Sequence, residues 1–215
     1  MIKKRQKGNL IVISGPSGSG KGTICNELIK RNSNIWISIS CTTRDMRPGD
    51  EEGKTYYFLN KEEFENRIKN NEFLEYAKYN ENYYGTLKSK IEEKLEEGYD
   101  VILEIEVQGA LKVKNMLPDT IFIFIMPPSM KELKSRLENR NTETKEKVLS
   151  RFKIAYKEIN EFSKYNYVVV NDNLNDAVNK VESIIVSTNC RVDRIEELDL
   201  DNIEELLHED LIDMN

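Results

Sequence analysis

The segment GPSGSGKGT, residues 15–23, contains the residue types of a loop that binds phosphates. Its Gly15, Gly20 and Lys21 match the pattern G-x-x-x-x-G-K, whereas Gly22 stands where the pattern usually continues with Ser or Thr. Glycines let the main chain wrap around a phosphate without Cβ clashes, and a lysine ammonium can follow the charge of a γ-phosphate during transfer. The segment therefore predicts an ATP site formed by Gly15, Pro16, Ser17, Gly18, Ser19, Gly20, Lys21, Gly22 and Thr23.

The residues on either side of this segment support the prediction. Asn9 to Ser14 is apolar and predicts a buried strand, and Thr23 to Arg31 has apolar residues at helical spacing. A loop between a strand and a helix brings main-chain N–H groups together at the helix N-terminus, which favours anions. We therefore interpret the segment as a P-loop.

The same segment leaves the binding of Mg²⁺ open, because Gly22 has no hydroxyl to offer. We expect the ion to be held mainly by ATP oxygens and water, with Thr23 and Glu104 as candidate protein ligands. Glu104 and Glu106, in the apparent strand VILEIE, should point to the same side because strand side chains alternate.

Further short apolar runs, separated mostly by amphipathic helical stretches, predict a three-layer α/β fold with a parallel sheet. They are Ile35–Ile39, Val101–Ile105, Ile121–Met126 and Tyr167–Val170.

Two polar regions interrupt this pattern. Thr42 to Leu95 is rich in Tyr, Asn, Glu and Arg and predicts an inserted subdomain, whose aromatic residues we expect to form mostly a local core. Glu138 to Lys147 is charged, lacks apolar periodicity and predicts a lid. We therefore expect one domain over 8–190, with core segments 8–38, 96–130 and 160–190, an insertion over 39–95, a lid over 131–159 and an acidic tail over 191–215.

Composition narrows the chemistry. The 215 residues carry a net charge of −6, but residues 193–215 alone have ten acids and one arginine, so the body is slightly positive and suits a small anionic substrate better than a nucleic acid. The single histidine, His208, lies in that tail, which excludes Ser-His catalysis and His-rich metal sites.

From about Val192 the tail is compatible with a short amphipathic helix, although we favour a solvated, partly disordered end.

The cysteines and apolar runs bear on location. Cys25, Cys41 and Cys190 are widely spaced and odd in number, which argues against a disulfide framework. The apolar runs are far shorter than the roughly 20 residues that cross a bilayer. We expect a cytoplasmic protein with small-molecule substrates and neither nucleic acid nor a membrane as partner.

Taken in order, the motifs resemble those of the guanylate kinase family. The matching pieces are GPSGSGKGT, SISCTTRDMRPGD, GKTYYF, EFLEYA, NYYGT, LEIEVQG, RLENRNTET and VVVND, and they run from about Asn9 to Val186. The resemblance implies a nucleoside-monophosphate-kinase fold with a GMP-binding insertion and a lid, acting on ATP, Mg²⁺ and GMP. The sequence departs from the usual family pattern at four positions. Gly22 stands where the family usually has Ser, Glu104 and Glu106 where it usually has Asp, and Asp50 where it usually has Glu.

The resemblance also assigns site residues. Guanidinium groups and phenol hydroxyls suit a dianionic phosphate, and a carboxylate with hydroxyls can distinguish guanine from adenine. For GMP the implied contacts are Ser40, Arg44, Arg47, Tyr56, Glu75, Tyr84, Thr86 and Glu106. For ATP and catalysis they are Lys21, Arg136, Arg140, Arg151 and, near the donor nucleoside, Asn171.

Two other functions fit parts of the sequence. A noncatalytic guanylate-kinase-like module would bind phosphopeptides on the same surface, but the retained Lys21 and lid arginines argue against it. A kinase with another acceptor, such as a phosphorylated ribose, would not need the base-reading set of Ser40, Glu75 and Thr86.

Overall fold

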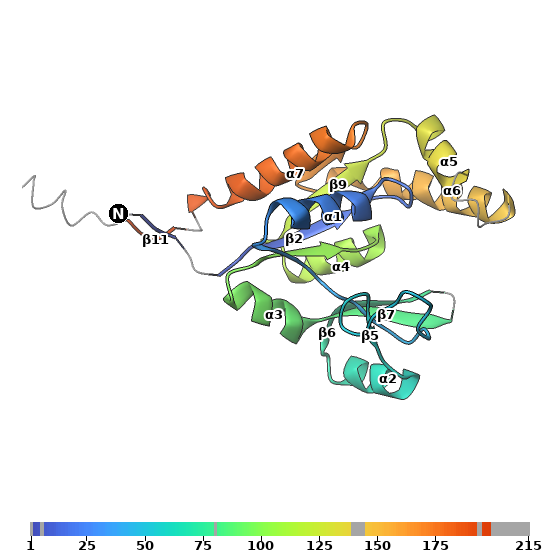
Figure 1. Ribbon diagram of the computed structural model, residues 1–215, viewed down its shortest axis with the longest axis horizontal. Coiled ribbons are helices and arrows are strands. Elements are labelled where there is room, and N and C mark those ends of the chain that lie inside the picture. Colours follow the sequence, from blue (N-terminus) through green and yellow to red (C-terminus); the bar gives the residue numbers. More distant parts are fainter. Residues whose placement is uncertain (1, 5–6, 80, 139–144, 193–194, 199–215) are drawn as a thin grey trace, which may run out of the picture.

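The computed structural model describes residues 2–4, 7–79, 81–138, 145–192 and 195–198. At its centre is a parallel sheet of five strands in the order β10-β9-β2-β8-β3, which confirms the predicted fold class (Figure 1). The strands are β2 (Leu10–Ser14), β3 (Ile35–Ile37), β8 (Asp100–Glu104), β9 (Ile121–Met126) and β10 (Tyr167–Val170). Strands β2 and β9 are buried almost throughout, as expected for a sheet covered on both faces.

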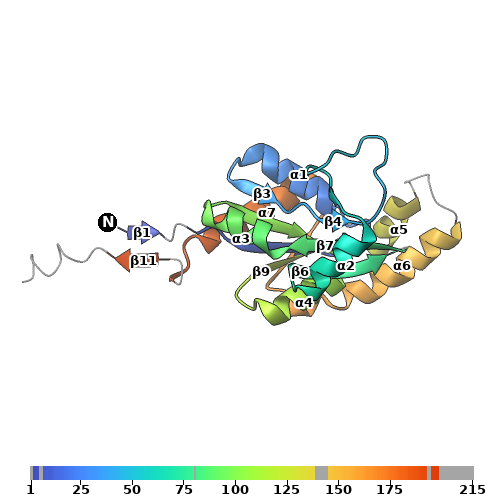
Figure 2. The ribbon, with the colours of Figure 1, turned by 90° about the horizontal axis from the view of Figure 1, so that it is seen from below.

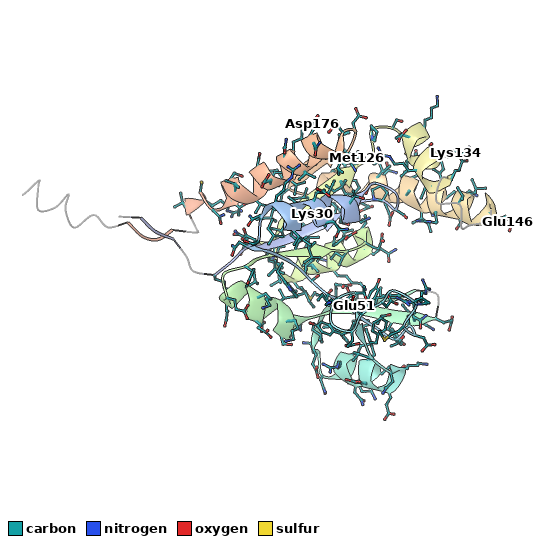
Figure 3. All side chains as sticks on the ribbon, in the orientation of Figure 1. Lys30, Glu51, Met126, Lys134, Glu146 and Asp176 are labelled. Carbon is teal, nitrogen blue, oxygen red and sulfur yellow. The ribbon has the colours of Figure 1, made fainter. Side chains whose placement is uncertain are left out.

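Alternation along β2 divides the core into two layers. Ile11 and Ile13 face helices α1 (Lys21–Arg31) and α7 (Leu174–Thr188), whereas Leu10 and Val12 face α3 (Lys88–Glu96) and α4 (Val107–Met116). The side chains between sheet and helices fill these layers (Figure 3). The carboxyl ends of the parallel strands are thereby fixed at one edge, where ligand sites of such sheets form.

The segment between β3 and β8 forms a second, four-stranded sheet in the order β5-β4-β7-β6 (Figure 2). Its elements are β4 (Cys41–Thr42), β5 (Tyr57–Phe58), α2 (Lys61–Lys69), β6 (Phe73–Tyr79) and β7 (Asn82–Leu87). Phe64 and Phe73 are buried and their rings stack 4.3 Å apart, with Tyr57 and Tyr83 packed around them. These aromatic side chains form the local core that their composition predicted, whereas Tyr76 is 41% exposed.

Two helices follow β9, and the C-terminal part of the second lies beside the P-loop. Helix α5 (Met130–Glu138) and helix α6 (Lys145–Ile159) pack through Leu133, Leu137 and Ala155. Arg140, a predicted catalytic residue, lies outside the described residues. A short 3₁₀ turn, Phe162–Lys164, leads from α6 to β10.

The first and last described segments of the chain form a small antiparallel pair. β1 (Ile2–Lys4) pairs with β11 (Ile195–Leu198), so the helix considered for the tail is wrong over these four residues. Main-chain N–H and C=O groups of this segment form hydrogen bonds with β1. The sequence of the segment alone does not indicate this distant partner. The rest of the tail, with His208, lies outside the described residues. Within the described ranges, no helix combines the length and apolar character needed to span a membrane.

Candidate active site

The P-loop connects β2 to α1 and depends on two glycines with positive φ. Gly15 has φ 145°, and a Cβ there would lie 2.3 Å from the carbonyl oxygen of Ile125 on the neighbouring strand. Gly20 has φ 93°, and a Cβ there would lie 2.3 Å from Asn171 Nδ2. Any side chain at either position would therefore displace the loop from its supports.

Lys21 begins α1 and folds back over the loop. Its ammonium donates to the carbonyl oxygens of Gly15 at 2.6 Å and Pro16 at 3.3 Å, and the residue is only 9% exposed. The first turn of α1 contains no acidic residue, so its N-terminal N–H groups face no competing carboxylate from that turn. The helix N-terminus and the Lys21 ammonium thus lie together at the loop, an arrangement that suits a polyphosphate.

Asn171, just after β10, joins the P-loop to α5. Its Nδ2 donates to the carbonyl oxygen of Ser19 at 2.8 Å, and Arg136 Nη2 donates to the carbonyl oxygen of Asn171 at 3.1 Å. A cavity of about 320 Å³ opens beside these residues. It is lined by Gly18, Gly20, Thr23, Arg136, Asn171, Asp172 and Leu174.

Helix α6 holds the tip of the P-loop through two side chains. Arg151 Nη2 donates to Ser17 Oγ, and the carboxylate of Glu158 lies near the main-chain N–H of Ser17, which favours the ionised form of that carboxylate. Burial and the charge of Glu106 raise the pKa of Glu158 to about 7, against the lowering effects of Lys21 and of the Ser17 N–H. The sequence prediction included Arg151 but missed Glu158. Their spacing of seven residues places both on one helical face, although it does not reveal Ser17 as their common partner.

Glu104 ends β8 next to the start of α1. A Cβ at Gly22 would lie 3.4 Å from Glu104 Oε1 and 3.5 Å from Oε2, so the carboxylate takes the space beside the missing side chain. The side chain opens to a cleft, but surrounding protein removes part of its hydration and raises the pKa of Glu104, while Lys21 opposes that shift and Glu106 adds to it.

These residues fit a cation bound mainly by nucleotide. No group of three or more Cys, His, Asp or Glu side chains that could hold a metal occurs within the described ranges. The Glu104 carboxylate beside the phosphate loop suits Mg²⁺, which keeps several waters and takes few protein ligands. Thr23 lines the 320 Å³ cavity and Glu104 lines another, so the two candidate metal ligands open to different cavities.

That other cavity, of about 620 Å³, lies between the core and the insertion. It brings together Ser40 and Tyr56, which the sequence assigned to the GMP site, with Glu104, which the sequence gave as a candidate metal ligand. The residues lining it are Asn26, Ile29, Ile35, Trp36, Ile37, Ser38, Ile39, Ser40, Gly53, Lys54, Thr55, Tyr56 and Glu104.

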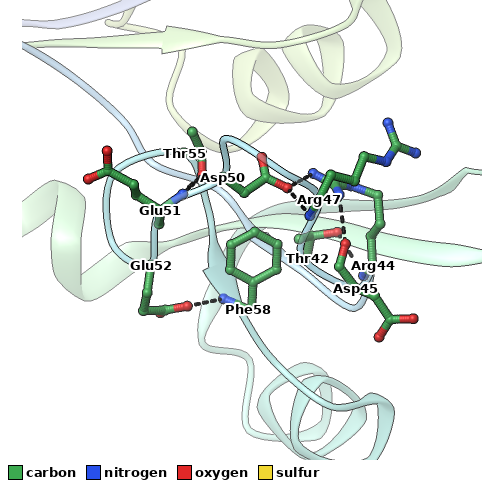
Figure 4. Close-up of polar contacts among 9 residues, drawn as sticks. All are labelled: Thr42, Arg44, Asp45, Arg47, Asp50, Glu51, Glu52, Thr55 and Phe58. Atoms are coloured by element: carbon green, nitrogen blue, oxygen red, sulfur yellow. Dashed lines mark hydrogen bonds and ion pairs between the residues drawn. The ribbon is translucent and has the colours of Figure 1, made fainter.

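Arg44 is held in place by the carboxylate of Asp50 and lies beside the ring of Phe58 (Figure 4). Its Nη2 lies 2.9 Å from Asp50 Oδ2, and its guanidinium carbon lies 5.3 Å from the centre of the Tyr56 ring. Asp50 Oδ2 also accepts from the main-chain N–H of Arg47 at 2.7 Å, and this bond, with the Arg44 guanidinium, lowers the pKa of Asp50. The Tyr84 ring meets the Tyr56 ring edge-on at 5.9 Å. Arg44 and two phenols thus gather around one short loop and its neighbouring strands, whereas Arg47 joins them through its main-chain N–H and has an exposed side chain.

Glu75 and Thr86 face each other across β6 and β7. They are paired in the sheet register, and Thr86 Oγ1 donates to Glu75 Oε1 at 2.8 Å. Burial raises the pKa of Glu75, whereas the hydrogen bond from Thr86 and the charge of Lys112 lower it. The second oxygen of the carboxylate points toward helix α4, where a Cβ at Gly109 would lie 3.2 Å from it.

Comparison with known proteins identifies the family. The guanylate kinase family model matches residues 7–188. A guanylate kinase of Clostridium tetani is 61% identical over 208 residues, covering 97% of this chain and all of the relative, and one of Clostridioides difficile is 46% identical over 94% of this chain and 98% of the relative. The crystal structure of guanylate kinase from Anaplasma phagocytophilum superposes with a TM-score of 0.73 at 32% identity and covers 96% of both chains. The chain therefore belongs to the guanylate kinase family, whose members phosphorylate GMP to GDP with ATP.

Proposed function

We propose that this chain phosphorylates GMP by direct in-line transfer of the γ-phosphoryl group of ATP, and that it accepts dGMP as well. The observation that carries the proposal is the presence of two complementary sites in one chain. One is the P-loop with Lys21 folded over it, and the other is the hydrogen-bonded pair of Glu75 and Thr86 in the insertion. The first suits a polyphosphate and the second suits a purine base with adjacent N–H donors.

Glu75 is the proposed determinant of base choice. One carboxylate can accept from both N1–H and the 2-amino group of guanine, whereas adenine presents an acceptor at N1 and has no 2-amino group. The Ser40 hydroxyl would donate to guanine O6, and Glu106 would add an acceptor. Thr86 would donate to O6 as well only by turning its single hydroxyl hydrogen away from Glu75. The wrong base would leave these groups unpaired.

The acceptor phosphate would be bound by Arg44 and Arg47 with Tyr56 and Tyr84. Asp50 keeps Arg44 oriented before the substrate arrives, which reduces the cost of ordering it. Guanidinium groups can bind a phosphate through paired hydrogen bonds, and the phenol hydroxyls add donors without charge.

The donor side would use the P-loop segment 15–23 for the phosphates and Asn171 near the nucleoside. Lys21, Arg136, Arg140 and Arg151 would neutralise charge on the transferring group. Glu104 would be the carboxylate closest to a bound Mg²⁺, with Thr23 as a second candidate, and the ion would supply charge neutralisation between the phosphates. Because the acceptor phosphate oxygen is already ionised, the mechanism needs positioning rather than a general base.

The lid would comprise residues 131–159, the GMP-binding insertion 39–95, and the reaction would take place in the cytoplasm, where ATP is the available donor. Closure of both parts over the substrates would exclude water that could otherwise accept the phosphoryl group.

An assay of ADP release with GMP, dGMP, AMP, CMP and UMP, each offered separately, tests the proposal. We expect fast turnover with GMP and dGMP and slow turnover with the others. A noncatalytic module would release no ADP with any of them. A kinase for a phosphorylated ribose would act on ribose phosphates and leave all five nucleotides unchanged.

A further inference from the structure

Helix α4 belongs to the core, yet one of its faces lies against strand β6 of the insertion. Leu74 of β6 is buried in the same cluster as Ala110 and Val113 of α4. Gly109 and Lys112 are one helical turn apart and both approach β6, beside the buried face of Ala110 and Val113, whereas Lys112 itself is exposed. The core helix therefore reaches the strand that carries Glu75.

Lys112 makes a specific contact there. Its ammonium donates to the main-chain carbonyl oxygen of Tyr76 at 3.2 Å and lies 5.8 Å from the centre of the Tyr76 ring. This fixes the main chain at the residue directly after Glu75. The positive charge of Lys112 also lowers the pKa of Glu75 and so favours its ionised form, as the hydrogen bond from Thr86 does, against the effect of burial.

The second contact is steric. Glu75 Oε2 lies where a side chain at position 109 would begin, at 3.2 Å from a Cβ built on Gly109. Without a side chain at that position, the carboxylate can approach the first turns of α4. Oε1 is engaged by Thr86, so α4 and β7 hold the carboxylate from two sides.

We propose that Lys112 is a positioning residue for base choice: from α4 it fixes β6 beside Glu75 and keeps a positive charge facing the carboxylate that selects guanine. This inference rests on the proposed role of Glu75. A carboxylate that took up a proton would turn an acceptor into a donor and face a guanine N–H with the wrong polarity. Lys112 opposes that change although it would not touch the substrate.

The test compares Lys112→Met, which keeps the aliphatic stem, with Lys112→Arg, which keeps a charged donor. Lys114→Met is the matched control, because Lys114 lies on the same helix but donates to the carbonyl oxygen of Lys164, away from β6. Michaelis constants for GMP and for IMP, which lacks the 2-amino group, are measured at saturating ATP between about pH 5 and 8.

We expect Lys112→Met to raise the KM for GMP about twofold to fivefold, the range for an exposed charge pair, while the KM for ATP stays unchanged. The kcat/KM for GMP divided by the kcat/KM for IMP should decrease. The rise of the GMP KM at acid pH should begin at a higher pH than in the parent, because Glu75 would hold its proton longer. Lys112→Arg should restore the parental GMP to IMP ratio and the parental pH dependence of the GMP KM. Added salt should reduce the difference in GMP KM between the parent and Lys112→Met.

Two results would overturn the inference: an unchanged GMP KM in Lys112→Met, or a raised one with no shift of the acid limb and no change in the GMP to IMP ratio. Glu75→Gln is run in parallel to separate this from a failure of the proposed function. If Glu75→Gln also keeps the parental GMP to IMP ratio, Glu75 does not select the base, and the inference about Lys112 falls with it.

Discussion

The carboxylate of Glu104 lies 3.4 Å from the point where a Cβ on Gly22 would sit. Each residue departs from the family pattern that the sequence resembles, one toward a smaller side chain and the other toward a longer one. The two differences are therefore neighbours in the structure. The side chain of Glu104 extends toward the space that the hydroxymethyl group of a serine at position 22 would occupy. We infer that the longer acid on β8 compensates for the smaller side chain at position 22.

This relationship predicts a coupling between the two positions. Glu104→Asp shortens the acid by a methylene and should raise the Mg²⁺ concentration for half-maximal rate by about tenfold. Gly22→Ser alone should also raise it, because the new side chain crowds the Glu104 carboxylate. The double variant should recover most of the loss, since a serine hydroxyl beside a shorter acid restores the usual arrangement. Initial rates are measured as a function of free Mg²⁺ for the parent, the two single variants and the double variant. If the increases in half-maximal Mg²⁺ concentration of the single variants add up in the double variant, the compensation is refuted.

Lys21 gives the most direct test of the P-loop. Lys21→Ala should lower kcat at least about a hundredfold, because the ammonium would no longer follow the charge on the transferring phosphoryl group. The measurement is steady-state ADP release, with thermal unfolding as the control for folding. A folded variant with near-parental kcat would be incompatible with the P-loop assignment.

Local patterns were sufficient to predict the central elements. The apolar runs at 121–126 and 167–170 form β9 and β10 with the predicted bounds, because each run is short, rich in β-branched and aromatic residues, and bordered by polar residues or prolines. The strand predicted over 35–39 ends at Ile37, after which the chain leaves the sheet toward the insertion. That boundary is set by tertiary contacts rather than by the apolar pattern.

Contacts between distant segments could not be predicted in the same way. Glu158 is an ordinary acid in a charged helix until the fold places it at Ser17, 141 positions earlier in the sequence. Lys112 likewise has no motif around it, and its meaning depends on β6 crossing α4. The tail segment 195–198 has helical-looking spacing, but pairing with β1 decides its conformation.

The raised pKa of Glu158, about 7, predicts a pH-dependent stability. The folded protein binds this proton more tightly than the unfolded chain, whose carboxyl has a pKa near 4.5. Stability from this group is therefore greatest below about pH 4.5 and is lost as pH rises to about 7. The glutamine of Glu158→Gln cannot titrate. The melting temperature of this variant minus that of the parent should therefore increase between about pH 4.5 and 7 and stay constant above pH 7. Glu146→Gln, on the exposed part of the same helix, is the control; a constant difference between parent and Glu158→Gln across this pH range would contradict the prediction.

Glu75→Gln tests base choice most sharply. The amide keeps one acceptor, but its NH₂ group would face a guanine donor, and the negative charge is lost. Losing a hydrogen bond to a charged group costs roughly 1.5 to 3 kcal/mol, which corresponds to a change of about tenfold to a hundredfold in relative efficiency. We therefore expect a raised KM for GMP, a smaller gap between GMP and AMP, and an almost unchanged KM for ATP. Thr86→Val, which removes the hydroxyl that holds Glu75 Oε1, should move the same constants by a smaller amount. If ATP binding weakens while GMP binding and base preference stay as they were, Glu75 lies outside the acceptor pocket.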